Sequence, residues 1–580
     1  MTRRSAATAI ALALAACAQL ACAAGGRQLP ALGRRPGHDA SWLPGEPRLE
    51  LHAPRALGGA RAAPPELVAR TRGGKGGAGI MPVYKKEFPM FFTFAAMMFF
   101  TIFIFTMARD TKDTLIVTSA GAEAIAFLKV YFVIPASMLF FLLYAKMSSV
   151  LSKRVLFAST MIPFIAFYAL FGFVLYPLRN TIHLAEMANV PQGLSYLVKL
   201  AQYWSFTLYY IVSELFGSVG VPLLFWQTAN DLVGVEQAKR WYPLFSTFGN
   251  LAPIVAGQTS ALVNGRFEYE AGLRILTAMI VAAGSGVLFS FFSVQRMADA
   301  ERAAKAAAAA QAAAAAAAQS AAGSPAQQQQ QQQQQAEAGA LVPKKKKPKL
   351  SMAQSLALLA RSEYLGLVCV LVLSYGLSIE FTEIMWKAVI KKHLPERSAY
   401  MRFMGQYSTA VGVTTLLMTL LGSQIPKRFG WKAGALATPI VIGSLSWVFF
   451  AYITFGKVEQ SASALRMAVL VGTVQNVLSK AVKYALFDPT KEMAYIPLDE
   501  DSKLKGKAAI DVLGARLGKS GGALIQQAIV VYTGSILGGA PVIASLFSAV
   551  IIAWIASVNK LNVLFKAKLK ERSAAQPDES

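Results

Sequence analysis

The stretch Phe88-Pro-Met-Phe-Phe-Thr-Phe-Ala-Ala-Met-Met-Phe-Phe-Thr-Ile-Phe-Ile-Phe-Thr-Met-Ala108 decides the fold, because it is uncharged and long enough to cross a bilayer as one helix. It is followed at once by Arg109-Asp-Thr-Lys-Asp-Thr114. The whole chain of 580 residues is 55% hydrophobic and only 15% charged, with a mean hydropathy of +0.44. This composition excludes a disordered, fibrous or ordinary soluble protein, and we interpret the chain as a membrane protein.

Apolar stretches of about 20 residues recur along the chain and predict twelve transmembrane helices, six on each side of a polar linker. Besides Phe88–Ala108, the predicted spans are Phe127–Ala145, Val155–Pro177, Tyr203–Ala229, Trp241–Val263, Gly272–Val294, Glu363–Trp386, Phe403–Ile425, Gly434–Phe455, Leu465–Phe487, Ala508–Tyr532 and Ser535–Val558. We therefore expect an all-α, polytopic membrane protein of two six-helix bundles, 83–298 and 351–560, resembling the major-facilitator architecture. An even number of spans puts both termini and the linker on one face.

Three further segments lie outside the bundles. The linker, 299–350, contains an alanine-rich tract, polyglutamine at Gln327–Gln335 and the basic run Pro343–Lys349, and it has too few apolar residues for a packed core. Beside membrane spans, such a basic run is expected to hold topology or touch anionic lipid rather than bind nucleic acid. Residues 561–580 are expected to form a polar tail.

The N-terminus has the composition of a targeting sequence. Residues 1–24 combine Arg3 and Arg4 with an apolar run and a small-residue end, as in a signal peptide. Residues 25–82 are rich in Arg, Pro, Gly and Ala and poor in acids, as in a transit peptide. The two parts together resemble the presequences that reach plastids bounded by extra membranes, and a secretory signal with a disordered linker is the alternative.

Charged side chains within apolar spans are costly, so each is a functional hypothesis. The candidates, in chain order, are Asp110, Lys112, Lys129, Glu214, Glu380, Glu383, Lys387, Lys480, Lys483 and Lys519. Glu383 and Lys387 have the i,i+4 spacing of a helical ion pair. Each lysine taken singly could also be snorkelling or structurally paired. Several lysines that converge at the midplane would form an anion site, which agrees with the net charge of +26.

Several other kinds of site are disfavoured. If the signal peptide with Cys17 and Cys22 is removed, Cys369 is left alone, and the four histidines are scattered, so we expect neither a metal site nor a cofactor. The stretch Gly514–Ser520 resembles a phosphate-binding P-loop but has three residues instead of four between its glycines and no preceding strand. A membrane enzyme would need a nucleophile, metal or acid/base pair, and we find no such set.

The charged segments resemble the plastid and intracellular-parasite ATP/ADP translocase family. The stretches that carry the resemblance are Arg109–Leu115, Ala122–Lys129, Glu214–Val219, Phe225–Asn230, Glu236–Phe245, Ser378–Lys387, Lys483–Asp501, Lys505–Asp511 and Gly518–Gln527. The resemblance covers roughly Phe88 to Val558, excluding the linker. It implies a twelve-helix nucleotide transporter that exchanges ATP for ADP, in some members with phosphate, in a plastid envelope membrane.

Carried over residue by residue, the resemblance assigns substrate binding to Lys129, Glu214, Glu383 and Lys519. We expect the two lysines to bind phosphates, and the two glutamates to pair with them in the empty carrier or to meet the nucleoside. Two other residues, the acid Glu380 and the basic Arg516, depart from the family pattern. Both departures leave open a rival function, the proton-coupled import of a broader set of nucleotides with Glu380 as proton carrier.

Overall fold

The computed structural model describes most of the two predicted bundles. It covers residues 83–321 and 362–575, apart from positions 186, 188, 189, 192, 423, 457, 459, 500–502, 504–505, 508–509 and 511–514. The predicted signal peptide, the transit segment, the polyglutamine tract and the basic run lie outside the described residues.

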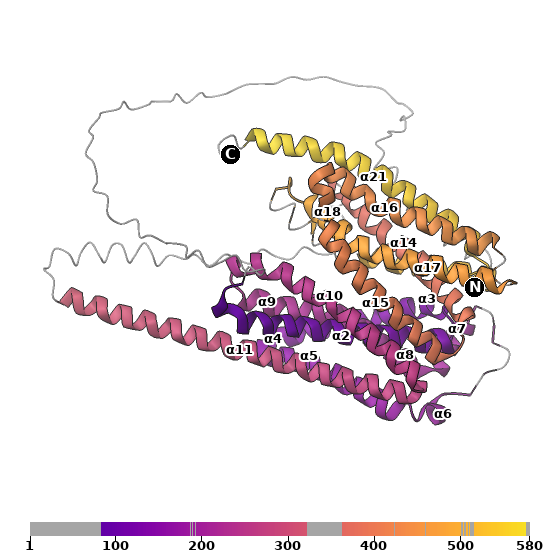
Figure 1. Ribbon diagram of the computed structural model, residues 1–580, viewed down its shortest axis with the longest axis horizontal. Helices are drawn as coiled ribbons and strands as arrows, with labels where there is room; N and C mark the ends of the chain where they lie inside the picture. Colours follow the sequence, from indigo (N-terminus) through magenta and orange to yellow (C-terminus); the bar gives the residue numbers. More distant parts are fainter. Residues whose placement is uncertain are drawn as a thin grey trace, which may run out of the picture. The chain divides into compact units, whose positions relative to one another are not determined.

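The N-terminal half is a series of helices that follows the predicted spans. They are η1 (Lys85–Glu87), α2 (Phe88–Ser119), α3 (Ala124–Leu128), η2 (Lys129–Val133), α4 (Ile134–Val150), α5 (Lys153–Leu170), η3 (Phe171–Leu175), α6 (Arg179–Ile182), α7 (Ser195–Gln202), α8 (Trp204–Val219), η4 (Gly220–Phe225), α9 (Trp226–Leu232), α10 (Val235–Arg266) and α11 (Tyr269–Ala321). In Figure 1 these helices run from indigo to dark pink.

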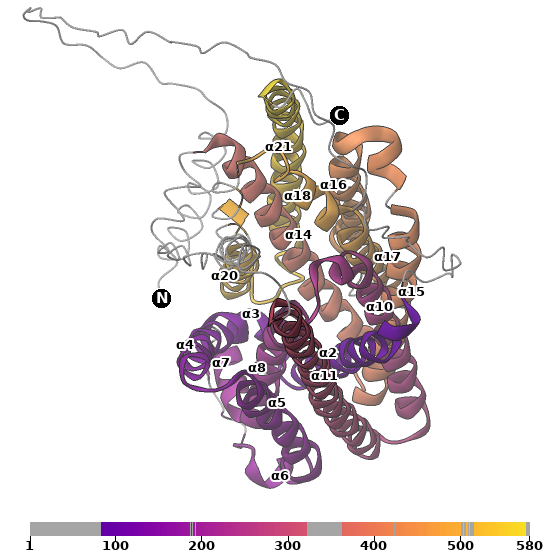
Figure 2. The same ribbon diagram turned by 90° about the vertical axis from the view of Figure 1, so that its left-hand side faces the viewer.

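The C-terminal half repeats this helical organisation. Its helices are α14 (Glu363–His393), α15 (Arg397–Gly422), α16 (Gln424–Phe455), α17 (Ala462–Val482), η5 (Lys483–Phe487), α18 (Asp488–Met493), α20 (Ala515–Thr533) and α21 (Ala540–Ala575). Helix α14 packs against both α20 and α21, as Figure 2 shows.

Long helical segments occupy all twelve predicted span positions within the described part of the chain. Eight of these segments are apolar and long enough to cross a membrane by composition and length. The other four positions are filled by α10, α15, α17 and α20, which carry more polar residues. The α20 segment begins at Ala515, whereas the predicted span begins at Ala508, and 508–509 and 511–514 are not described.

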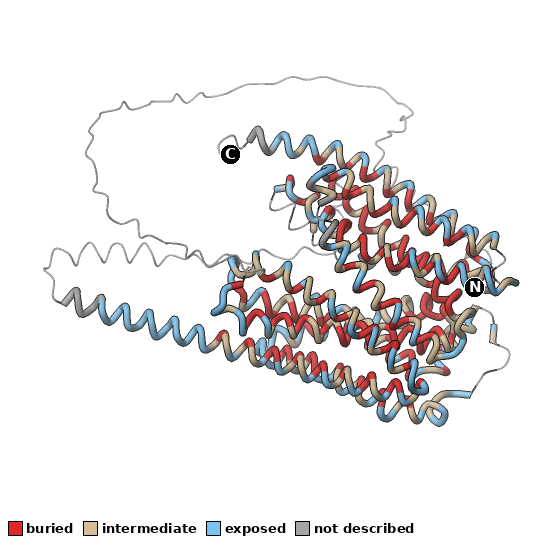
Figure 3. The backbone as a smooth tube through the Cα atoms, viewed as in Figure 1, coloured by how far each residue is buried: buried red, intermediate tan, exposed pale blue. Residues whose placement is uncertain are grey.

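Two helices run past the boundaries expected from composition. Helix α11 continues beyond residue 298 to Ala321, and α21 continues beyond residue 560 to Ala575. Alanine is the best helix former, and the pair Lys305–Glu301 (2.7 Å) adds i,i+4 support to the extension of α11. Residues 300–315 of this extension are exposed, as Figure 3 shows.

The halves meet through a close crossing of α10 and α15. A Cβ atom added to Gly257 would lie 2.4 Å from the carbonyl oxygen of Gly405, and one added to Gly405 would lie 2.6 Å from that of Gly257. Only glycine permits this approach, as in other small-residue contacts between membrane helices.

A second junction between the halves lies at the C-terminal end of α2. Lys391 donates to the carbonyl oxygen of Thr118 (2.6 Å), and Arg397 donates to the hydroxyls of Thr118 (3.2 Å) and Ser119 (2.7 Å). These cations from the other half satisfy a helix terminus that has no basic residue of its own in its last turn. In the predicted topology, this end of α2 lies on the face opposite the linker, so the halves are joined on that face.

Candidate functional site

The charges of α2 that follow its apolar segment are buried inside the protein. Lys112 and Asp113 pair directly, with 2.9 Å between Nζ and Oδ1. The Nζ of Lys112 also lies 3.0 Å from Oε1 of Glu214 and 3.8 Å from the centre of the Tyr210 ring. Tyr210 and Glu214 are four residues apart on α8, so both reach the same lysine from one helix face. The N-terminal half thus presents one ammonium between two carboxylates.

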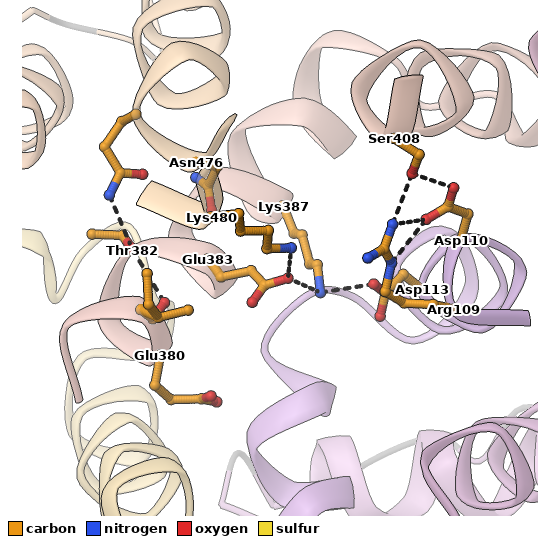
Figure 4. A network of polar contacts seen from close by, with 12 residues as sticks. Arg109, Asp110, Asp113, Glu380, Thr382, Glu383, Lys387, Ser408, Asn476 and Lys480 are labelled. Carbon is orange, nitrogen blue, oxygen red and sulfur yellow. Dashed lines mark hydrogen bonds and ion pairs between the residues drawn. The ribbon is translucent and has the colours of Figure 1, made fainter. Parts of the chain in front are cut away.

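The C-terminal half presents a matching group on α14 and α17. Lys387 lies 3.3 Å from Oε1 of Glu383, which confirms the predicted i,i+4 pair. Lys480 lies 3.6 Å from the same oxygen and 5.1 Å from the centre of the Tyr407 ring. Here one carboxylate stands between two ammonium groups, as Figure 4 shows.

A direct ion pair joins the two groups. Nζ of Lys387 lies 2.9 Å from Oδ2 of Asp113 (Figure 4). The result is a chain of alternating charges that runs through both halves, which we call the charge chain. Its members are Glu214, Lys112, Asp113, Lys387, Glu383 and Lys480, in that order.

A second ion pair also crosses between the halves. Lys129 donates to both oxygens of Glu380, at 2.8 and 2.9 Å. Lys129 is the first residue of the π-helical turn η2, and such turns within α-helices are frequent at functional sites. On the other side, the side-chain amide of Gln526 on α20 donates to the backbone carbonyl of Glu380 (2.9 Å).

Lys519 lies at the start of α20 and is exposed. A Cβ atom added to Gly376 would lie 3.2 Å from Cα of Gly518, and one added to Gly522 would lie 2.9 Å from the side chain of Glu380. These close approaches hold the start of α20 against α14 near Glu380. No ion pair joins Lys519 to another described residue, although it contributes to the electrostatic environment of Glu214.

Besides Glu380, two more secondary candidates lie outside the charge chain, Asp110 and Lys483. Asp110 accepts hydrogen bonds from Arg109 (3.1 Å) and from the hydroxyl of Ser408 on α15 (2.5 Å), so it ties the halves together at another point. Lys483 pairs with Asp488 (3.1 Å) within the C-terminal half.

The structure assigns different partners to the glutamates from those expected. The sequence prediction offered two alternatives for Glu214 and Glu383: pairing with Lys129 and Lys519 in the empty carrier, or contact with the nucleoside. Instead they pair with Lys112, Lys387 and Lys480, while Lys129 pairs with Glu380. The first alternative was wrong about the partners, because spacing along the chain does not specify which helices become neighbours. Contact with the nucleoside stays a prediction.

Asp113 is a central residue that the sequence reasoning noted beside Asp110 and Lys112 but did not include among the candidate binding residues. Its two oxygens each contact a lysine, one from each half of the protein. The available signal was its place beside Lys112 in the first charged stretch, but the second partner, Lys387, lies 274 positions further along the chain and becomes apparent only in the fold.

The described ranges contain no cluster of side chains suited to a metal ion. No group of three or more His, Cys, Asp and Glu side chains there has the arrangement to hold a metal ion. The carboxylates of the charge chain face lysines, so their geometry is that of an ion-pair network.

Comparisons with known proteins agree with this architecture. A model of the family described as TLC ATP/ADP transporter matches residues 70–565. The chain is 39% identical over 526 residues to ADP,ATP carrier protein 1 of Chlamydia pneumoniae, which covers 85% of this chain and 94% of the relative. It is 38% identical over 497 residues to the chloroplastic ADP,ATP carrier protein 2 of Arabidopsis thaliana, covering 82% and 74%.

Among solved structures, a bacterial homologue of the iron transporter ferroportin in an inward-facing state is similar in fold. The TM-score is 0.50 at 13% sequence identity, and the similarity covers 83% of this chain and 98% of that one. This confirms the predicted all-α, major-facilitator-like architecture, and at this identity it supports the fold alone.

Proposed function

The chain belongs to the TLC ATP/ADP transporter family, and on that premise we propose that it exchanges ATP for ADP across a plastid envelope membrane by alternating access. The observation that carries the proposal is the convergence of lysines from both halves on one polar layer. Lys112 and Lys129 come from the N-terminal half, and Lys387 and Lys480 from the C-terminal half. A polyphosphate offers several charged oxygens, which ammonium groups from two sides can bind together.

Within this layer we assign the phosphates to Lys129 and Lys519. Lys129 is held by Glu380 across the boundary between the halves, and Lys519 is exposed nearby on α20. Glu214 and Glu383 hold the lysines of the charge chain when nucleotide is absent, or meet the nucleoside when it is bound. Both glutamates are partly exposed, at 34% and 20% of the side chain, so cargo has access to Glu214 at one end of the charge chain and to Glu383 next to the other end.

The remaining lysines of the charge chain supply further donors. Lys112, Lys387 and Lys480 each already contact a carboxylate at 3.6 Å or less. A bound phosphate therefore has to replace protein carboxylates instead of entering an uncompensated positive site. Such replacement makes affinity depend on competition between two anions for the same cation.

Exchange of ATP for ADP moves about one net negative charge, which is worth roughly 2.3 kcal/mol per 100 mV of membrane potential. Phosphate carried together with ADP would remove this dependence. We propose that phosphate is carried together with ADP. The exchange rate should then not depend on membrane potential, which can be measured directly.

The rival function, proton-coupled import with Glu380 as proton carrier, has less support. Both oxygens of Glu380 are engaged by Lys129, and its side chain is only 3% exposed. A proton carrier must be reached by water at some stage. In an exchanger, by contrast, the same carboxylate holds the ammonium group of Lys129 until a phosphate replaces it.

We propose transport without catalysis. The relatives that match the chain are named as carriers, and the site we describe consists of paired ions. A channel is a further alternative, but it would not need lysines from both halves to pair across their boundary.

The plastid location rests on composition and on relatives. Plant relatives include the chloroplastic Arabidopsis carrier and the plastidic ATP/ADP-transporter of Solanum tuberosum, 37% identical over 502 residues. Related carriers also occur in Chlamydia and Rickettsia, so the location needs its own test. A fluorescent protein fused after residue 82 should accumulate in plastids, and secretion of the fusion would contradict the assignment.

Reconstitution of the full chain into liposomes tests the proposed exchange. Uptake of labelled ATP should require internal ADP, because the empty carrier does not reorient freely. Lys129→Ala and Lys519→Ala should raise the apparent KM for ATP or abolish exchange, since each removes a proposed phosphate donor.

The matched control is Lys153→Ala. Lys153 is 68% exposed and pairs with Asp231 away from the charge chain. Its removal should leave exchange unchanged. Equal uptake into empty and ADP-loaded vesicles by the unmodified chain would indicate a symporter or channel and refute the antiporter.

A further inference from the structure

The charge chain passes from one half of the protein to the other at a single link among the described residues, the pair Asp113–Lys387. Oδ1 of Asp113 contacts Lys112 of its own half, and Oδ2 contacts Lys387 of the other half, each at 2.9 Å. Asp113 is thus the residue at which the two halves share one carboxylate.

This link is deeply buried. The side chains of Asp113 and Lys387 are 2% and 4% exposed. If the halves separate at this point, Lys387 keeps only Glu383, which it already shares with Lys480. Breaking a buried ion pair leaves a charge without compensation, which is strongly unfavourable. The pair therefore resists separation of the halves.

An anion that binds Lys387 in place of Asp113 removes this resistance. The phosphate groups of a nucleotide have the required chemistry, because they carry charged oxygens that accept hydrogen bonds from ammonium groups. Asp113 is not left alone in this exchange, since Lys112 remains beside it. Both halves then keep a compensated charge as they part.

We propose that Asp113 is the residue that couples reorientation to cargo. In the empty carrier its carboxylate holds Lys387 and keeps the halves together. In the loaded carrier a phosphate holds Lys387 instead, and this link no longer opposes separation of the halves. This inference rests on the proposed exchange function and adds the residue that makes exchange obligatory.

The other ion pair between the halves is expected to contribute less. Lys129 is 21% exposed, so water partly replaces Glu380 when that pair opens. Glu380 is only 3% exposed, but the Lys129 end of that pair reaches water, whereas both ends of the Asp113–Lys387 pair are buried. The larger coupling effect should therefore follow from Asp113.

The test compares uptake of labelled ATP into empty and ADP-loaded liposomes by the full chain carrying Asp113→Asn. The unmodified chain should give a low ratio of empty to loaded uptake. Asp113→Asn should raise that ratio by about tenfold or more, which corresponds to about 1.4 kcal/mol or more of lost coupling. Asp113→Glu, which keeps the carboxylate, should restore a low ratio.

Asp231→Asn is the matched control, because it removes a carboxylate that pairs with the exposed Lys153. Its ratio should equal that of the unmodified chain. An unchanged ratio in Asp113→Asn, measured on protein that still exchanges nucleotide, would overturn the proposal. A ratio that rises equally in Asp231→Asn would also overturn it, since the effect would then not be specific to the link.

A second variant covers the case in which Asp113→Asn does not fold. Asp113→Asn combined with Lys387→Gln removes both charges and leaves no uncompensated lysine at the link. The folded double variant should take up ATP into empty vesicles. A folded double variant without such uptake would contradict the coupling role of Asp113. High empty-vesicle uptake by the unmodified chain would instead refute the exchange function itself, so the two failures are distinguishable.

Discussion

The two segments of helix α2 differ in what holds them in place. The first, Phe88–Ala108, packs through aromatic and aliphatic side chains, and Phe91 stacks on Phe245 of α10 with ring centres 5.4 Å apart. The second, 109–119, carries the charges that reach helices of both halves, including Ser408 and Lys387. One continuous helix is thus a structural element over its first part and a junction between the halves over its second.

Under the proposed alternating access, the difference separates a rigid part of the helix from a part whose contacts change with cargo. Close packing of apolar side chains depends on shape and holds within one half in every state. Ion pairs between the halves depend on which anion is present, so cargo can exchange for a protein carboxylate. Both parts belong to one continuous helix, so the proposed mechanism expects a change at the charged part to move the apolar part with it.

The largest effect is expected from Lys112→Ala in the charged segment. The variant leaves Asp113 with only Lys387 and removes the ammonium that contacts Glu214 at 3.0 Å. Loss of one partner from a buried network costs about 3–5 kcal/mol, so we expect loss of exchange together with a lower unfolding temperature. Exchange assays and thermal unfolding in detergent measure the two effects, and normal exchange would show that the two segments of α2 do not differ.

A smaller effect, confined to stability, is expected from Phe91→Ala in the apolar segment. Phe91 is fully buried against Trp241 and Phe245, and its truncation should lower the free energy of unfolding by about 3 kcal/mol. Exchange per folded molecule should persist. The neighbouring Phe92→Ala is the control, because Phe92 is 44% exposed and should matter less. Loss of exchange in folded Phe91→Ala would contradict the expected difference between the apolar and the charged segment of α2.

The smallest effect is expected at the very end of α2, from Arg397→Gln. The variant weakens the hydrogen bonds to Thr118 and Ser119, which should shift the equilibrium away from this conformation by about 1 kcal/mol, or roughly fivefold. Spin labels at the exposed positions Asn180 and Glu396 measure the distance between the halves. In Arg397→Gln, a larger fraction of molecules should show a long label-to-label distance than in the unmodified chain.

Arg274→Gln is the control for that shift. Arg274 is 51% exposed, and its ion pair with Glu270 lies within α11. Its distance distribution should match that of the unmodified chain. Identical distributions for Arg397→Gln and the unmodified chain would show that the end of α2 does not hold the halves together.

Much of the fold was accessible from hydropathy, because each span buries its own backbone hydrogen bonds and needs about 20 apolar residues. The pair Glu383–Lys387 was also predictable, since four residues make one helical turn. The boundary at residue 298 was less accessible, because the alanine tract lacks apolar periodicity yet continues α11 as a helix.

The partners within the site could not be predicted in the same way. Glu214 was identified as a charge in an apolar span, but its contact with Lys112 depends on the packing of α2 against α8. The role of Asp113 depends on α14, which comes from the other half of the chain. Neither contact has a signal in local spacing.

The sequence by itself determined a helical membrane protein of two halves and the residues whose charges need a function, because the costs of exposing backbone and burying charge in lipid are local. The tertiary structure alone decided which charges meet. Asp113 and Lys387 become partners, and Glu380 holds Lys129, because helices distant in the chain pack together. An ion pair acts over a few ångströms of space, and sequence distance does not limit it.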